Sequence, residues 1–203
     1  MCSNDSWQSR AKLEKVLNSM KLELVIALLM LATSISAAQS ASLNDHVREQ
    51  TNFGAEGDFD KPVPLPIEAL QLLRKSKDAD DSVQECAEQE GIPASQIPAS
   101  WFVASEIRLS GRPASGLVIR GEHECLGGAH IAQFWVLARS NAGYDIVFRG
   151  RADALSVMRT RTNGYRNLQL IFTMQAGRYV DYVNFRYSEG AYHKSGHHLT
   201  HPN

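Results

Sequence analysis

The residues best suited to nucleophilic chemistry are concentrated between Glu122 and His130. The segment reads EHECLGGAH and places Cys125 five residues before His130. A cysteine nucleophile needs a nearby base to form its thiolate, and an imidazole is of the right type. Gly127 and Gly128 could bring backbone N–H groups close to a developing oxyanion. The segment therefore defines one alternative function, a small hydrolase that uses Cys125 with a histidine.

A second group of reactive side chains crowds the C-terminal end: His193, His197, His198 and His201. Imidazoles at positions i and i+4 of a helix can bind zinc or copper. Gly196 and Pro202 disfavour a rigid helix in this segment. We therefore expect residues 194–203 to form a loose, His-rich tail whose histidines are only weak metal candidates.

The main binding candidate is a group of tyrosines and arginines in the last third of the chain. Arginine beside tyrosine is typical of protein interfaces and of anion or glycan sites. Because residues two apart share a face of a strand, Asn184 and Arg186 should lie opposite Val183 and Phe185. One face of the sheet should then pack on the core and the other should face solvent. The solvent-exposed face could bind a ligand, or it could be only a solvated surface with salt bridges. The predicted ligand-binding residues are Arg159, Arg161, Tyr165, Arg166 and Arg186.

Residues 1–38 are predicted to be an extra N-terminal segment followed by an export signal. Met20 opens a short charged start, LVIALLMLATSIS is apolar, and small residues follow up to Ala38. The apolar run is too short for a membrane span of about 20 residues. We expect translation from Met20 and cleavage near Ala38, with residues 1–19 an extra segment or, alternatively, a long charged region. The mature protein would be periplasmic or secreted, without a transmembrane anchor.

Two cysteines remain after such cleavage, Cys86 and Cys125. An even pair in an exported chain predicts one disulfide. In the chain-entropy model, closing a loop of about 40 residues stabilises the fold by about 4 kcal/mol. A bonded Cys125 has no thiol, so with this interpretation we expect no catalytic residue, and we expect no cofactor.

Charge is unevenly distributed along the chain, although the formal net charge is −1. Residues 41–100 carry 12 acidic and 5 basic residues, whereas residues 139–187 carry eight arginines and three aspartates. Such asymmetry can mark an anion-binding face, or the two parts can neutralise each other within the molecule. Nucleic acid is a poor fit because lysine clusters are missing. No phosphate-cradling glycine loop, Gly-x-Ser-x-Gly or His-Glu-x-x-His motif is present.

Helical patterns are confined to the part of the chain before Trp101. Residues 39–65 are rich in Gly, Asp and Pro and predict a linker or arm. A helix should begin at Pro66, and a second short helix should cover residues 82–90. The positions expected to face the core are Ile67, Leu70, Leu73, Val83 and Cys86.

From Trp101 onward, short apolar runs alternate with turn residues, which is typical of β-strands. Asn163-Gly164 is the sharpest hairpin signal because both residues tolerate positive φ. The stretch FWVLARSNAGYDIVF predicts another hairpin, with Trp135 buried. The expected strands cover residues 101–109, 116–120, 133–138, 144–148, 154–159, 168–173 and 179–187, with a weak strand after Gly190.

Two stretches of about 50 residues resemble each other, beginning at Ser105 and Ser156. Gly111 then aligns with Gly164, and each stretch contains two hairpins, although any meander of short strands can align with itself. Two units are too few for a propeller or a solenoid. The predicted fold is α+β, with one or two N-terminal helices packed on one largely antiparallel sheet of about seven to eight strands, in a single domain over residues 66–193.

The pattern CLGGAHIAQFWVLARSNAGYDIVF, followed by TRTNGYRNLQLIF and VNFRYSEGAY, resembles a group of small exported bacterial proteins of unknown function. Those proteins share a Cys-Leu-x-Gly-Ala turn, a Phe-Trp strand, a Gly-Tyr hairpin and a Thr-x-Gly-Tyr-x-(Asp/Asn)-Leu element. The resemblance covers residues 82–193 and implies location and fold rather than an activity. The chain is also similar to the blades of secreted FG-GAP-type repeats, but their acidic calcium loop is missing because residues 110–115 carry no carboxylate.

Together these patterns predict an exported, non-catalytic binding module of a bacterial envelope. It would use its Tyr/Arg-rich sheet face or its hairpin tips to bind an unknown protein or an anionic polymer of the envelope. An inhibitor of a secreted hydrolase is one concrete form of this function, by analogy only. The hydrolase that uses Cys125 and His130 is the alternative.

Overall fold

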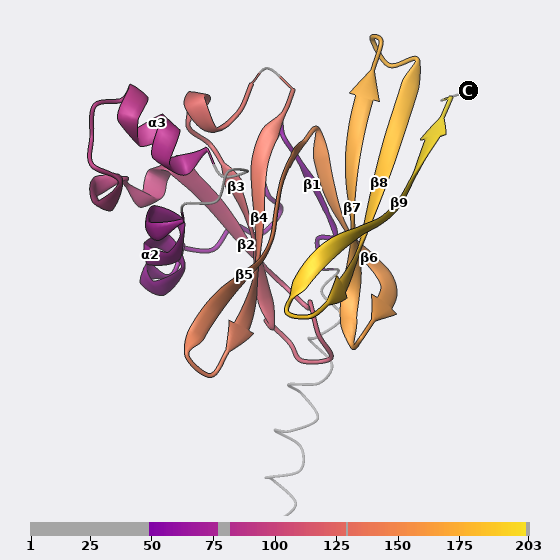
Figure 1. The fold of residues 1–203 in the computed structure, drawn as a ribbon, viewed down its shortest axis with the longest axis horizontal. Helices are drawn as coiled ribbons and strands as arrows, with labels where there is room; N and C mark the ends of the chain where they lie inside the picture. The colour runs from indigo at the N-terminus through magenta and orange to yellow at the C-terminus, as the bar shows by residue number, and fades with distance from the viewer. Residues whose placement is uncertain (1–48, 77–81, 129, 202–203) are drawn as a thin grey trace, which may run out of the picture. The chain divides into compact units, whose positions relative to one another are not determined.

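The computed structural model describes residues 49–76, 82–128 and 130–201 (Figure 1). The predicted export signal and the residues before it lie outside this described part. Among the described residues, no helix combines the length and apolar character that a membrane crossing requires.

Two helices precede most of the strands, as predicted: α2 (Ile67–Lys75) and α3 (Val83–Gln89). Glu68 in the first turn of α2 and two basic residues in its last turn complement the helix dipole. Ile67 does not face the core but is 54% exposed, because the buried stripe of α2 is centred on other residues. The buried helix residues are Ala69, Leu70, Leu73, Val83, Cys86 and Ala87.

Short 3-10 turns connect the helices to the strands and follow one of them. They are η2 (Ala94–Gln96), η3 (Ala99–Trp101) and η4 (Glu124–Leu126). Trp101, predicted to begin a strand, instead ends η3, and the first strand of the meander begins at the next residue.

The strands form two antiparallel sheets. The first sheet has the order β2-β3-β4-β5, and the second has the order β1-β6-β7-β8-β9. The strands of the first sheet are β2 (Phe102–Ile107), β3 (Gly116–Gly121), β4 (Ala132–Ser140) and β5 (Gly143–Ala152). Those of the second are β1 (Asn52–Gly54), β6 (Ala154–Thr162), β7 (Tyr165–Met174), β8 (Tyr179–Ser188) and β9 (Ala191–Thr200).

The α+β class with helices before a largely antiparallel meander is confirmed, but a single continuous sheet is wrong. Only Asp153 separates β5 from β6, and the chain changes sheets there. The two units of the predicted internal similarity coincide with β2–β5 and β6–β9, each a meander of four strands. Each unit also has a register shift in its last strand pair.

The reason for two sheets is that both have an apolar face to bury. One buried cluster joins Phe134 and Phe148 of the first sheet to Leu168 and Val183 of the second. Gly150 lets the sheets approach closely, because a Cβ there would lie 2.9 Å from Leu170 Cδ1. Burial of this kind contributes about 25 cal/mol per Å² of apolar surface.

A second buried cluster fills the space between the helices and the other face of the first sheet. It contains Leu70 and Leu73 of α2, Cys86 of α3, and Leu137 and the predicted Trp135 of β4. Trp135 is fully buried, which confirms the prediction for this hairpin. The described fold is therefore layered as helices, first sheet and second sheet (Figure 1).

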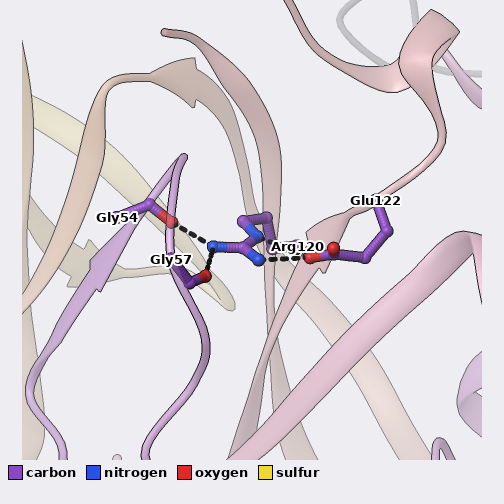
Figure 2. Close-up of polar contacts among 4 residues, drawn as sticks. All are labelled: Gly54, Gly57, Arg120 and Glu122. Atoms are coloured by element: carbon purple, nitrogen blue, oxygen red, sulfur yellow. Dashed lines mark hydrogen bonds and ion pairs between the residues drawn. The ribbon is translucent and has the colours of Figure 1, made fainter.

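Of the predicted alternatives for residues 39–65, a linker or an arm, the described part is an arm that belongs to the fold. Asn52–Gly54 forms β1 and pairs with β6, and Phe53 and Phe59 are buried edge to face with ring centroids 5.0 Å apart. Arg120, only 5% exposed, holds this arm in place (Figure 2). Its guanidinium donates to the backbone oxygens of Gly54 and Gly57 at 2.6 and 2.8 Å, pairs with Glu122, and lies 5.0 Å from the Phe59 ring centroid.

The weak strand predicted after Gly190 is present as β9, and it extends through residues 194–200, where a loose tail was expected. Tyr192 anchors the start of β9 because its ring is 8% exposed and its hydroxyl donates to Arg166 O at 2.5 Å. The strand then pairs with β8 as far as Thr200 opposite Val180. Backbone pairing thus orders a polar segment that apolar periodicity alone does not identify as a strand.

Candidate functional site

Turns of an antiparallel meander alternate between the two ends of its sheet. The β2–β3 loop and the β4–β5 turn therefore share one end of the first sheet, and the β6–β7 turn lies at the same end, low in Figure 1. Residues 110–115, 139–141 and 164–165 of these turns line an open cavity of about 660 Å³. We call this cavity the hairpin cleft. Its size lies within the range of small-ligand sites.

Backbone hydrogen bonds fix the walls of the hairpin cleft. Arg139 N donates to Ser115 O at 3.0 Å, and Ser110 N donates to the Ser115 hydroxyl at 2.8 Å. Arg166 N donates to Leu109 O at 2.8 Å, which ties the second sheet to the loop of the first. Three turns from distant parts of the sequence are thus held as one surface.

The β6–β7 turn has the conformation that Asn163-Gly164 predicts. Both residues have positive φ, 51° and 82°, as a tight hairpin turn requires. The Asn163 side chain donates to Tyr187 O at 2.9 Å, and the Arg161 guanidinium donates to Gly164 O at 3.1 Å. The turn is therefore braced from both of its flanks.

The chemistry of the hairpin cleft suits a negatively charged group. Arg112 of the β2–β3 loop and Arg139 near the end of β4 are its charged lining residues, and the lining contains no carboxylate. The guanidinium carbon of Arg139 lies 5.5 Å from the Tyr144 ring centroid, a cation–π contact that helps to fix it. Asn141 and Tyr165 add polar groups that can donate to the same ligand.

A tyrosine cluster supports the cleft from the core side. The rings of Tyr165 and Tyr187 stack with centroids 3.9 Å apart, and Tyr187 meets Tyr192 edge to face at 5.4 Å. Burial raises the pKa of Tyr192 far above its usual range, and the neighbouring phenols of Tyr187 and Tyr165 raise it further. Burial and the Tyr165 phenol also raise the pKa of Tyr187.

This cluster makes the fold sensitive to alkali. Unfolded tyrosine ionises near pH 10, whereas folded Tyr192 stays protonated, so the unfolded state releases protons first. The stability that protonated Tyr192 contributes below pH 10 should be lost progressively as the pH rises above 10. Tyr192→Phe should lose about 1 kcal/mol at pH 7 through the missing hydrogen bond but show a shallower decline above pH 10. Urea unfolding between pH 7 and 11 measures the loss at pH 7 and the decline above pH 10. If the free energy of unfolding fell in parallel with pH in both proteins, Tyr192 would not be the source of the alkali sensitivity.

The predicted ligand-binding residues divide into three groups. Tyr165 lines the hairpin cleft, and Arg161 braces its β6–β7 turn. Arg166 is 5% exposed and donates to the backbone oxygens of Val157 and Met158, each at 2.6 Å, so its guanidinium has a structural role. The exposed Arg159 and Arg186 do not line the cleft.

The two faces of the second sheet follow the predicted alternation. Val183 belongs to the buried cluster and Phe185 packs against it. Asn184, on the opposite face, accepts a hydrogen bond from the Gln169 amide at 2.9 Å. The dry and wet sides are therefore confirmed, but the cavity lies at the end of the strands rather than on the wet side.

The cysteines are paired as predicted. Cys86 of α3 and Cys125 of η4 form a disulfide with their Cα atoms 5.4 Å apart. His130, the expected base for Cys125, instead contacts Glu56 at 2.7 Å, and the imidazole next to Cys125 belongs to His123, with Nδ1 3.0 Å from Sγ. Since the thiolate is the nucleophile of cysteine enzymes, the structure provides no Cys125–His130 pair for the alternative hydrolase.

The C-terminal histidines do not form the helical pairs considered for metal binding. His198 stacks on Tyr182 with centroids 4.8 Å apart, and the His201 ring lies 4.5 Å from that of Tyr179. Over residues 49–76, 82–128 and 130–201, the one group of three metal-ligating side chains with close ligand atoms is Cys86, His123 and Cys125, and the disulfide already joins two of these.

Sequence reasoning missed Arg112 and Arg139 as site residues. Both lie in or beside segments recognised as turns, and a meander places its first and third turns at one end. The sequence signal that could have identified them is an arginine in or beside each of two turns that lie at the same end of the sheet. The part that no local pattern supplies is the contribution of the second sheet through Tyr165.

The fold and the site define a two-sheet α+β protein with a layer of helices and an arginine-lined cleft between hairpin turns. Comparisons with protein-family models, with curated proteins and with solved structures find no match. The functional argument therefore depends on the chemistry of the site itself.

Proposed function

We propose that this chain is an exported, non-catalytic binding module that holds the anionic groups of an envelope polymer in the hairpin cleft. The observation that carries the proposal is that Arg112, from the β2–β3 loop, and Arg139, from the end of β4, line one cavity without a carboxylate. A guanidinium offers a planar fork of donors that matches carboxylate, phosphate or sulfate oxygens. Two such groups can hold successive charges of a polymer or both sides of one charge.

The rest of the lining supports a polymer of sugars over a small inorganic ion. Tyr165 offers an aromatic ring with a hydroxyl, and Asn141 offers an amide, so the cleft combines charge with groups for neutral hydroxyls. Because the cavity is open, a long chain can pass through it without being enclosed. A protein with an acidic loop would use the same arginines and is the other outcome that the experiment distinguishes.

Export supports the same proposal. The disulfide between Cys86 and Cys125 favours an oxidising compartment, and the sequence of residues 20–38 predicts the signal that leads there. In the periplasm or outside the cell, anionic glycans are abundant partners. An inhibitor-type module would be one special case in which the anionic partner is an enzyme.

Binding of three polymers tests the proposal: alginate, dextran sulfate and neutral dextran, measured by calorimetry or by retention on coated beads. Alginate or dextran sulfate should bind, with an affinity that falls as salt rises, and neutral dextran should not. Replacing Arg112 and Arg139 together by serine should weaken binding by about 100-fold, since each charge-assisted hydrogen bond contributes about 1.5–3 kcal/mol.

Arg178→Ser is the matched control, because Arg178 is an exposed arginine in the β7–β8 turn and does not line the cleft. It should bind like the unmodified protein. Equal binding by the double variant, or binding of neutral dextran, would refute an anionic site in the cleft. Retention of one envelope protein but none of the anionic polymers would assign the cleft to a protein partner instead.

A further inference from the structure

The disulfide between Cys86 and Cys125 has an imidazole as its direct neighbour. His123 immediately precedes η4, and its Nδ1 lies 3.0 Å from Cys125 Sγ and 3.8 Å from Cys86 Sγ. The ligand atoms of the three side chains all lie within 4.8 Å of one another. We call these three residues the Cys–His cluster. Cys86 comes from α3 and the other two from the region of η4, so the fold brings them together.

The orientation of the His123 ring is fixed from two sides. The ring stacks on Trp101, with centroids 4.0 Å apart. At the ring edge that faces away from the sulfurs, Glu90 Oε1 lies 4.0 Å from Nε2. The carboxylate attracts the proton of the neutral ring to Nε2 and leaves the lone pair on Nδ1, facing the two sulfurs. Imidazoles that bind metals are commonly oriented by a carboxylate in this way.

The lone pair on His123 Nδ1 has a use only when the disulfide is reduced. The sulfurs of a disulfide carry no proton, so they cannot donate a hydrogen bond to this nitrogen. The His123 side chain is only 22% exposed and Cys86 is 1% exposed, so solvent has little access to this space. After reduction the same arrangement presents two cysteine sulfurs and one imidazole nitrogen, which are the ligands that zinc prefers in proteins.

The distances in the Cys–His cluster are close to those between the ligands of a tetrahedral zinc ion. Zn–S bonds of about 2.3 Å and Zn–N bonds of about 2.0–2.1 Å place two ligand atoms about 3.5–3.8 Å apart. The distance of 3.8 Å between Nδ1 and Cys86 Sγ is already in this range. Cys125, which is only partly buried, has to turn its sulfur away from the other two atoms once the S–S bond is broken.

We propose that the reduced Cys–His cluster binds one zinc ion through Cys86 Sγ, Cys125 Sγ and His123 Nδ1. A dithiol protein reduces the disulfide: it gives up two electrons and two protons and forms its own disulfide, while the bond between Cys86 and Cys125 breaks and both become thiols. Zinc then displaces the two thiol protons and binds both thiolates, whose charges balance its own. Three protein ligands leave the fourth tetrahedral position to solvent. This site goes beyond the proposed polymer-binding function and does not depend on it.

The experiment compares two redox states of one chain, the full protein with Cys2→Ser, in which Cys86 and Cys125 are the remaining cysteines. After reduction with a phosphine, it should bind one zinc ion with a dissociation constant on the order of a micromolar or tighter, measured by competition with a chromophoric chelator. The oxidised chain carries the same histidines and carboxylates but should bind about 100-fold more weakly, or less. Cobalt should give thiolate-to-metal charge-transfer absorption only with the reduced chain.

Two variants of the reduced chain test the histidine and its carboxylate. His123→Gln removes the nitrogen ligand and should weaken zinc binding about 100-fold, but the thiolate absorption of cobalt should remain because both sulfurs are present. Glu90→Gln should weaken zinc binding about tenfold, as the loss of an orienting carboxylate does. His130→Gln is the matched control, since the exposed His130 contacts Glu56 instead, and it should bind like the unmodified chain. If His123→Gln fails to fold, Glu90→Gln at its half-exposed position still decides the matter.

Thermal unfolding in metal-free buffer gives a second readout. Zinc should raise the melting temperature of the reduced chain, because an ion that binds the folded state stabilises it. It should leave the melting temperature of the chain with Cys86→Ala and Cys125→Ala unchanged.

Three results would overturn the proposal. Equal zinc affinity in the two redox states would place the ion elsewhere, with the C-terminal histidines as the first candidates. No binding by the folded, reduced chain would leave His123 as a packing partner of Trp101 alone. Unchanged affinity in both His123→Gln and Glu90→Gln would show that the two thiolates bind zinc without the imidazole.

Discussion

Replacing Arg120 with alanine should lower the free energy of unfolding by about 3 kcal/mol, because one buried side chain connects three parts of the molecule. The guanidinium binds the backbone oxygens of Gly54 and Gly57 and the carboxylate of Glu122 (Figure 2). It also lies over the ring of Phe59. Alanine would leave two backbone carbonyls without this donor and Glu122 without its partner. Urea unfolding followed by circular dichroism measures the change.

The loss of stability should appear first as local opening of the N-terminal arm that contains β1. β1 pairs with β6 through only three residues. Without Arg120, the backbone amide of Phe53 should therefore exchange with deuterium much faster than the backbone amides of β7. Arg120→Lys should recover only part of the stability, since an ammonium lacks the planar fork. Arg159→Ala, at an exposed position, should change stability by less than about 0.5 kcal/mol. A loss below about 1 kcal/mol for Arg120→Ala would show that the arm is held by apolar packing alone.

Removing the disulfide has the second large expected effect. Changing Cys86 and Cys125 together to alanine should lower the free energy of unfolding by about 4 kcal/mol, because the unfolded chain regains the freedom of a loop of about 40 residues. The bond also fastens α3 to η4, beside the stacked rings of Trp101 and His123, whose centroids are 4.0 Å apart. The melting temperature of the variant measures the loss.

Reduced wild-type protein is the matched comparison for this variant. Its stability should fall to nearly that of the double alanine variant, and reoxidation should restore it. Thiol titration of the unfolded, unreduced protein, with Cys2 removed, should find no free thiol. Two free thiols, or no stability difference on reduction, would refute a structural disulfide and return Cys125 to consideration as a nucleophile.

Local signals in the sequence determined the secondary structure and the covalent link. Asn163-Gly164 required a tight hairpin, and the apolar run around Trp135 required a buried strand, because backbone conformation and side-chain burial act over a few residues. Cys86 and Cys125 were the only pair left after the predicted cleavage, so their bond needed no knowledge of the fold. The alternation of Val183 and Asn184 likewise separated core from solvent without a tertiary model.

Two segments were predicted less precisely because their order comes from distant partners. Residues 52–59 carry few apolar residues, yet Phe53 and Phe59 are buried once Arg120 closes over them. Residues 194–200 have no apolar periodicity, yet β8 supplies the backbone hydrogen bonds that make them a strand. In both segments the stabilising contacts lie far away in the sequence, where composition and spacing carry no information about them.

Only the tertiary structure decided which arginines line a cavity. The sequence pointed to Arg159, Arg161, Arg166 and Arg186, but the Arg166 guanidinium donates to backbone carbonyls inside the fold. The cavity is lined instead by Arg139 and Arg112. That difference arises because the chain changes sheets at Asp153 and folds the second meander onto the first. The two-residue period of a strand determines the face on which a side chain lies. The cavity at the end of the strands exists only because the loops of one sheet and a turn of the other come together in the folded chain.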